Sequence, residues 1–268
     1  FADALNSYLS QTYKELELIV IDDCSTDNSV EVINRLLNEK NIITNFICNK
    51  ANQGICKNMN LGIAVSKGSY FSVVASDDYF GPKRYEKLMN AAKQADDSYK
   101  LFYSNCKMVD ENGEVIENDF INFFRPLLEV KSGNIFPELL KGNFIPAIAL
   151  LIKKDVFTSV GLFDETLRLE DYDMWLRIAA KYNFLYVEDD EVYYRQLNHS
   201  LMRTLEKRNT YYREHFNVLF KHIGNSGKKD AKSLFNQLCN LYKAHLKRNK
   251  RINWQMTKKL IMARYKLA

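Results

Sequence analysis

The sequence predicts an α/β protein whose sheet is mainly parallel, and two observations carry that prediction. Apolar runs of strand length alternate with amphipathic runs of helix length along the first 200 residues, the pattern of strands joined through helices. The connections are short and rich in Asp, Asn, Gly and Ser, as is typical of βα units. With 268 residues, 46% of them hydrophobic, the chain can bury one large core plus an appendage.

The elements follow in order from these patterns. Strands are predicted at residues 16–22, 42–49, 69–75, 100–110, 146–152, 184–189 and 191–195. Helices are predicted at residues 2–13, 29–40, 55–65, 153–160 and 168–179, and a further helix begins at Pro82. Asn112-Gly113 is a strong hairpin signal. Residues 120–145 show no regular period, and a loop of that length inside a compact domain predicts a functional lid.

Charge is distributed unevenly along the chain. From Arg203 onward there are 17 Lys/Arg and 3 Asp/Glu, a net charge of +14, which leaves −9 for residues 1–202. We therefore expect an acidic body over residues 1–203 and a basic helical extension over 204–268. Amphipathic helices, basic charge and Trp254 predict either a solvated cap or a surface that binds an anionic membrane. No nucleic-acid-binding motif occurs, so a nucleic-acid partner is not expected.

The cysteines indicate the compartment. The five cysteines include no C-x-x-C pair and are odd in number, which favours free thiols in a reducing compartment. We expect a cytoplasmic protein, at most peripheral at the inner face of the plasma membrane, because the longest apolar runs are too short to cross a bilayer. The chain starts at Phe1 rather than Met, and we expect that a preceding piece is missing.

Three acidic pairs fall where an α/β sheet binds ligands. Asp22-Asp23 and Asp77-Asp78 each follow a predicted strand, and Glu170-Asp171 begins a predicted helix. Any one pair could be only a cap or a turn, but ligands bind beyond the carboxyl ends of strands in such sheets. Clustered carboxylates without a Cys/His pattern favour Mg²⁺ or Mn²⁺. Since both G-x-x-x-x-G-K-[ST] and G-x-G-x-x-G are absent, the residues predict metal-assisted nucleotide-diphosphate chemistry without a P-loop.

Three stretches resemble family 2 glycosyltransferases of the GT-A fold: residues 4–33, 52–80 and 160–179. The resemblance covers about residues 1–200 and implies a GT-A catalytic domain over residues 1–203. It implies transfer of a sugar, with inversion, from a nucleotide-diphosphate donor to an acceptor hydroxyl, with a divalent metal. The expected enzyme is of the hexosyltransferase type, with a UDP-sugar donor and a glycan or lipid-linked acceptor, in the assembly of bacterial surface polysaccharide or glycans.

The resemblance also implies roles for single residues. Asp23 would read the base, Asp78 would ligate the metal, and Asp77 would lie against the ribose or donor sugar and assist at the metal. Asp171 would be the general base, with Glu170 positioning the acceptor. The remaining nucleotide-binding positions would be Asn52, Gly54, Lys57 and Asn60.

The chain departs from the family pattern at three places. Asn58-Met59-Asn60 replaces a motif that carries an arginine in many relatives, and the point charge of Lys57 does not replace its planar fork. Leu197 occupies the usual His position, so His199 becomes the alternative metal ligand. The family's first strand would precede Phe1. Two rival functions stay open: a non-catalytic nucleotide-sugar-binding module, and a nucleotidyltransferase, which needs a Gly-rich basic loop before Phe1.

Overall fold

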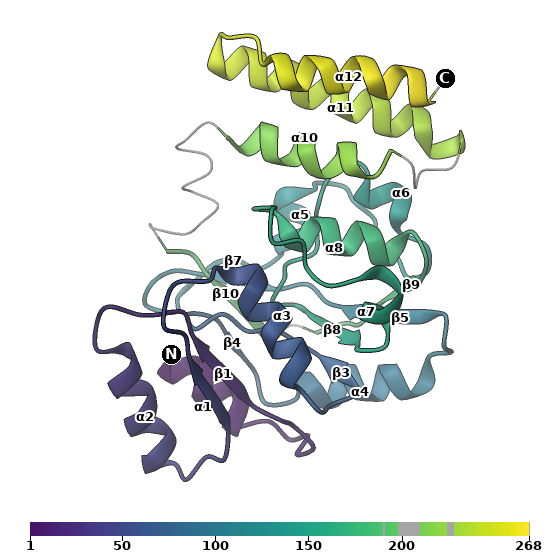
Figure 1. Ribbon diagram of the computed structural model, residues 1–268. Helices are drawn as coiled ribbons and strands as arrows, with labels where there is room; N and C mark the ends of the chain where they lie inside the picture. Colours follow the sequence, from purple (N-terminus) through teal and green to yellow (C-terminus); the bar gives the residue numbers. More distant parts are fainter. Residues whose placement is uncertain (190, 198–209, 224–227, 268) are drawn as a thin grey trace.

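The computed structural model describes residues 1–189, 191–197, 210–223 and 228–267 (Figure 1). The helices are α1 (Ala2–Leu9), α2 (Ser29–Glu39), α3 (Ile55–Val65), α4 (Arg84–Gln94), α5 (Phe120–Phe124), α6 (Phe136–Leu139), α7 (Val156–Val160), α8 (Glu170–Ala179), α10 (Tyr211–Lys221), α11 (Lys228–Asn249) and α12 (Trp254–Leu267). The strands are β1 (Ile19–Asp22), β2 (Asn45–Cys48), β3 (Tyr70–Phe71), β4 (Tyr79–Phe80), β5 (Tyr99–Tyr103), β6 (Lys107–Val109), β7 (Val115–Glu117), β8 (Leu150–Lys153), β9 (Asn183–Tyr186) and β10 (Val192–Arg195). The predicted α/β alternation is confirmed.

The first acidic pair lies at the end of a parallel strand pair. β1 runs parallel to β2, with Ile19 opposite Asn45 and Asp22 opposite Cys48. Helix α2 buries Ile33 and Leu37 on the face its periodicity predicts, where they cluster with Leu5 of α1. Because β1 ends at Asp22, the turn into α2 begins with the acids, as the sequence predicts.

The remaining strands form two mixed sheets, ordered β3-β8-β5-β9 and β4-β10-β6-β7. Among the strand pairs of the described residues, three are parallel and four are antiparallel. The prediction of a mainly parallel sheet is therefore wrong. One reason is local: β6 and β7 are joined by the Asn112-Gly113 turn, where Gly113 has φ +90°, and a tight hairpin makes its strands antiparallel.

The main core surrounds α8. Met174, Trp175, Leu176 and Ile178 of this helix are all buried in one cluster. The same cluster continues into the C-terminal helices through buried residues such as Phe216, Leu234, Leu238 and Met256, and Figure 1 shows α10, α11 and α12 stacked on the side of α5, α6 and α8. The expected helical character of the basic segment is confirmed for the described residues, while the expected boundary near residue 203 lies outside them.

Residues 120–145 differ from the irregular loop that the sequence predicts. The segment contains α5 and α6, and its apolar side chains Ile121, Ile135, Leu139 and Leu140 are buried in the main core. Helices of four or five residues are too short to show a period, which is why the pattern looked irregular. This segment is packed against the site rather than open above it.

The described helices include none that is long and apolar enough to cross a membrane. All five cysteines belong to the described residues, and each is a free thiol, as the sequence predicts.

Candidate active site

Asp23, the residue after β1, is bonded by the loop that follows β2. Its Oδ1 accepts hydrogen bonds from the backbone N–H of Gln53 at 2.7 Å and from Nδ2 of Asn49 at 2.9 Å, and its Oδ2 accepts from the N–H of Gly54 at 2.8 Å. Burial raises the pKa of Asp23, but these bonds and one from Asn58 outweigh it and bring the pKa to about 2. The ionised carboxylate therefore fixes this loop at the end of β1.

Three of the expected nucleotide-binding residues gather on that loop and at the start of α3. Asn52 donates from Nδ2 to the carbonyl oxygen of Asp23 at 3.4 Å. Gly54 precedes the first turn of α3 with φ +82°, a conformation that favours glycine. Lys57 donates from Nζ to Oε1 of Gln53 at 3.4 Å. The backbone N–H groups of a helix N-terminus attract anions, so this end of α3 suits a phosphate.

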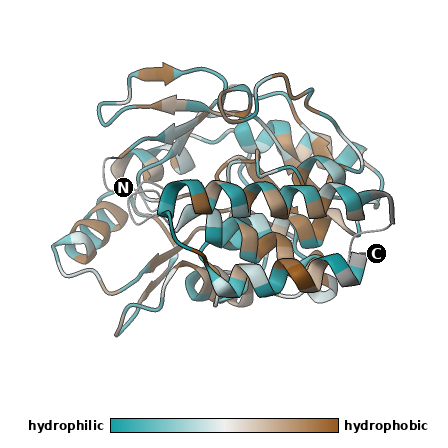
Figure 2. Cartoon of the chain, turned by 90° about the horizontal axis from the view of Figure 1, so that it is seen from above, coloured by the Kyte–Doolittle hydropathy of each residue, from teal (hydrophilic) through white to brown (hydrophobic). Residues whose placement is uncertain are grey.

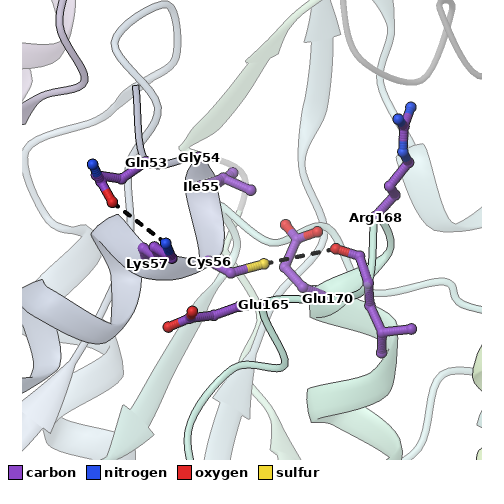
Figure 3. Close-up of a pocket in the computed structure, with 9 residues that line it drawn as sticks. Gln53, Gly54, Ile55, Cys56, Lys57, Glu165, Arg168 and Glu170 are labelled. Carbon is purple, nitrogen blue, oxygen red and sulfur yellow. Dashed lines mark hydrogen bonds between the residues drawn. The ribbon is translucent and has the colours of Figure 1, made fainter. Parts of the chain in front are cut away.

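A pocket of about 210 Å³ lies between the start of α3 and the segment that leads into α8 (Figure 3). Its lining residues are Gln53, Gly54, Ile55, Cys56, Lys57, Glu165, Leu167, Arg168 and Glu170. Asn60 connects the two walls, since its Nδ2 donates to the carbonyl of Phe163 at 3.0 Å and its Oδ1 accepts from the N–H of Phe163 at 2.9 Å. The side chain of Asn60 is thus engaged within the protein.

Glu170 is the buried acid of this pocket. Its side chain lies beside Cys56 in Figure 3, the residue is 6% exposed, and its Oε2 has no hydrogen-bond partner among the residues that the structure describes. Burial, and then the charge of Asp171, raises the pKa of Glu170 to about 8. A buried oxygen without a partner is costly and is usually satisfied by a ligand or water, so Glu170 is available to a hydroxyl that enters the pocket.

Asp171 follows in the first turn of α8. Its Oδ2 accepts from Nδ2 of Asn143 at 3.3 Å and its Oδ1 from the N–H of Tyr172 at 2.6 Å. Burial raises the pKa of Asp171 to about 6 even though both hydrogen bonds lower it. A carboxyl with a pKa near neutrality is suited to accept a proton in a reaction.

Asp78 is the buried member of the second pair, at 3% exposure. Its Oδ1 accepts from the N–H of Arg195 at 2.8 Å. Burial, and to a lesser degree the charge of Asp77, raises the pKa of Asp78 to about 7. The Arg195 guanidinium donates to the carbonyls of Asp77 at 2.8 Å and Glu111 at 2.7 Å, and to the Asp3 carboxylate at 2.7 Å. β10 therefore fixes the Asp77-Asp78 turn.

The Asp77-Asp78 pair fits a divalent cation. The charge of Arg195 lowers the pKa of Asp78 but does not outweigh burial, which leaves the pKa at about 7, so a further positive charge would be favourable there. Two carboxylates are the hard oxygen donors that Mg²⁺ and Mn²⁺ prefer. Within the described ranges, no group of three or more His, Cys, Asp and Glu side chains is arranged to hold a metal, so other ligands would come from diphosphate oxygens and water. His199, the alternative ligand, lies outside the described residues.

Tyr194 of β10 is influenced by acids of the second and third pairs. Burial raises the pKa of its hydroxyl to about 12, and the charges of Asp78, Asp77 and Asp171 add to that rise. Carboxyls that are far apart in the sequence therefore act electrostatically on the same hydroxyl.

Three residues that bond the site acids could not be singled out from the sequence: Asn49, Asn143 and Arg195. Each donates across a long stretch of chain, to Asp23, Asp171 and Asp78 respectively. The Tyr-rich strand that contains Arg195 can be predicted from the sequence. No local pattern indicates that the backbone N–H of Arg195 bonds to Asp78.

A comparison with known protein families identifies the family of this chain. The family model described as Glycosyl transferase family 2 matches residues 1–155. The chain belongs to glycosyl transferase family 2. The matched range contains Asp23 and the Asp77-Asp78 pair, and it ends before the α8 acids.

Several curated proteins resemble this family 2 chain. A Rickettsia bellii protein named as an uncharacterized glycosyltransferase is 34% identical over 180 residues, covering 66% of this chain and 25% of that protein. A Rickettsia felis protein of the same name is 32% identical over 179 residues, covering 66% of this chain and 28% of that protein. The chain thus spans about a quarter of the length of these relatives.

Solved structures share the fold. The mannosyltransferase PcManGT from Pyrobaculum calidifontis, in complex with GDP-Man and Mn²⁺, superposes with a TM-score of 0.66 at 15% identity, covering 98% of this chain and 69% of that chain. Residues 1–349 of S. aureus TarS give a TM-score of 0.60 at 16% identity, covering 99% of this chain and 75% of that chain. At these identities the likeness shows the GT-A-like α/β fold alone.

Proposed function

We propose that this family 2 glycosyltransferase is an inverting enzyme that moves a hexose from a nucleotide-diphosphate donor to an acceptor hydroxyl. The observation that supports it most is that Asp78 and Asp171, buried acids from distant parts of the chain, both act electrostatically on the hydroxyl of Tyr194. Both carboxyls have pKa values raised toward neutrality, to about 7 and about 6. Asp78 is suited to bind a cation and Asp171 is suited to accept a proton, and such a transfer requires both.

Asp171 is the general base of this proposal. Its ionised carboxylate takes the proton of the acceptor hydroxyl while the oxygen forms a bond to the anomeric carbon. The bond from that carbon to the diphosphate breaks on the opposite face, and the nucleoside diphosphate leaves with the electron pair. An α-linked donor gives a β-glycoside. Glu170, with its unbonded Oε2 in the pocket, would accept a hydroxyl hydrogen bond and hold the acceptor in position.

Asp78 and Asp77 hold the diphosphate end of the donor in this proposal. A Mn²⁺ or Mg²⁺ ion bound by their carboxylates would supply Lewis-acid stabilisation of the leaving diphosphate. Arg195 keeps the pair in place through the N–H bond to Asp78 and the guanidinium bond to the carbonyl of Asp77. Lys57 lines the α3 pocket. Of the two basic residues of that lining, it lies nearer in the sequence to Asn58-Met59-Asn60, where many relatives carry an arginine.

We assign the nucleotide to the loop that Asp23 holds, with Asn52 and Gly54 at its turn. A uridine diphosphate sugar is the proposed donor, and TarS, which shares the fold, has been solved in complex with UDP. PcManGT holds GDP-Man, so a guanosine donor is the first rival to test. For the acceptor we propose a glycan or lipid-linked glycan of bacterial surface polysaccharide assembly, a class consistent with the bacterial relatives.

A screen of nucleotide sugars for Mn²⁺-dependent hydrolysis tests the proposal. We expect one donor to be hydrolysed to the free sugar and the nucleoside diphosphate. Asp78→Ala should abolish the metal-dependent turnover without unfolding the chain, because the residue lies in the connection that leads into β4 and not within a helix or strand. Donor binding without turnover would instead support a non-catalytic sugar-nucleotide module, and release of pyrophosphate from a nucleoside triphosphate would support a nucleotidyltransferase.

A further inference from the structure

Helix α12 carries apolar side chains on two opposite sides. Met256 and Ala263 are buried in the main core, which also contains residues of α10 and α11. On the other side Trp254, Ile261 and Met262 are 74%, 55% and 42% exposed. Their spacing of seven and eight residues places them on one face of a helix. A helix that buries one apolar stripe and exposes another has a surface that a partner usually covers.

Basic side chains share this exposed face. Lys258 is exposed one helical turn from Trp254 and one turn from Met262, and Arg264 and Lys266 are exposed on its two flanks. Arg251 and Ile252 are exposed just before the helix. Residues 251–268 contain no Asp or Glu. In Figure 2, seen from above, the C-terminal helices lie across the near side of the molecule with hydrophobic and hydrophilic residues alternating along them.

We propose that the α12 face, made of Trp254, Lys258, Ile261 and Met262 with its basic flanks, docks on an anionic lipid bilayer. The apolar side chains enter the interfacial region, while the Lys and Arg stems let their charges reach the lipid phosphates. The basic charge selects anionic lipid because juxtaposed basic residues are attracted to its surface potential. This inference goes beyond the proposed function and does not depend on catalysis.

Two other partners account for less of this surface. A second copy of the chain would bring two basic segments into contact, each of net charge +14 from Arg203 onward, and like charges oppose association. A nucleic acid would match the charge but leaves the exposed Ile261 and Met262 without a role. A lipid surface accounts for both the charge and the apolar side chains.

Vesicle binding with the intact chain tests the proposal, and the protein carries its own reporter. Trp175 is buried at 2% exposure, so a change in tryptophan emission on binding reports Trp254, the second of two tryptophans. We expect co-sedimentation with vesicles that contain phosphatidylglycerol, a blue shift of the emission, and weaker binding as salt rises. Vesicles of phosphatidylcholine alone should bind far less.

Matched variants distinguish binding through the α12 face from nonspecific binding. Trp254→Ser with Ile261→Ser should abolish the vesicle binding, and Lys258→Glu with Lys266→Glu should weaken it by more than about tenfold, given about fivefold for each charge near the surface. Ile43→Ser and Lys40→Glu are the controls, since Ile43 is 97% exposed and Lys40 is exposed on the N-terminal part of the chain. Both controls should bind as the parent does.

Several results would overturn the docking proposal. They are no binding of the parent chain to anionic vesicles at low salt, equal binding by the α12 variants, or binding to an RNA duplex that competes fully with the vesicles. Donor hydrolysis without vesicles is the separate readout for catalysis. The α12 variants should keep that hydrolysis. A parent chain that binds vesicles but hydrolyses no donor would contradict the proposed function and still support the docking proposal.

Discussion

Asn143 donates a hydrogen bond of 3.3 Å from its Nδ2 to Oδ2 of Asp171, and so joins the segment after α6 to the first turn of α8. Burial raises the pKa of Asp171 to about 6, and the bond from Asn143 opposes that rise. Because a general base must be ionised to accept a proton, this amide helps to set the pH range over which Asp171 can work.

Asn143→Ala should therefore move the acidic limb of the pH–rate profile upward. A net hydrogen bond of about 1 kcal/mol corresponds to about 0.7 of a pKa unit, so transfer should fall several-fold near pH 6 and little at pH 8. The measurement is kcat/KM across pH 5–9, with Asn122→Ala, an exposed amide of α5, as the control. A uniform loss at every pH would show that Asn143 does not act through the base.

Asp78→Asn should stabilise the metal-free chain and abolish its response to Mn²⁺. Burial raises the pKa of Asp78 to about 7, above its ordinary value, so the folded chain binds more protons than the unfolded chain between about pH 4 and 7. The parent loses stability as the pH rises through that window. The gain from the variant should thus grow from about pH 4 and level off above about pH 7.

Thermal unfolding with and without Mn²⁺ checks this second prediction. Added Mn²⁺ should raise the Tm of the parent at pH 8 and leave the Asp78→Asn variant unchanged. A variant less stable than the parent at pH 8 without metal, or one that Mn²⁺ still stabilises equally, would remove Asp78 from the metal site.

Asp173 joins helix α8 to the C-terminal segment. It is fully buried, and its carboxylate accepts from Nε of Arg177 at 2.9 Å and Nζ of Lys221 at 3.1 Å, and is bonded to Nε2 of His222 at 3.0 Å. Burial raises the pKa of Asp173, but these partners outweigh it and lower the pKa. Their contribution is therefore present above the ordinary pKa of an aspartate and is lost as the pH falls below it.

Asp173→Asn should destabilise the whole chain by about 3 kcal/mol at pH 7, the cost of breaking a buried ion pair. Because the core is continuous between α8 and α10, denaturant unfolding should remain a single transition that occurs at a lower midpoint. Asp164→Asn, which removes a more exposed partner of Lys221, should cost less. Two separate transitions would mean that the helical segment is an independent domain.

Local pattern predicted the parts of the site that local chemistry determines. The end of β1 at the first acidic pair and the start of α8 at the third follow from apolar period and turn residues, and both are confirmed. The contacts of Arg195 with Asp78 and of Asn143 with Asp171 could not be predicted, because they depend on which strand ends meet in space. The prediction of mainly parallel strands was wrong for a similar reason, since apolar runs look alike in parallel and antiparallel pairs.

In the proposed mechanism Asp171 takes the acceptor proton, and a comparison of two variants decides whether it does. Transfer should be measured for Asp171→Asn and Glu170→Gln with the donor and acceptor that the parent enzyme uses, beside calorimetry of nucleoside-diphosphate binding. Asp171→Asn should bind the nucleotide as the parent does and lose transfer by a factor of about 10²–10⁴, the usual worth of a general base. Glu170→Gln should lose less. Near-parental transfer by Asp171→Asn, or a greater loss in Glu170→Gln, would contradict the assignment.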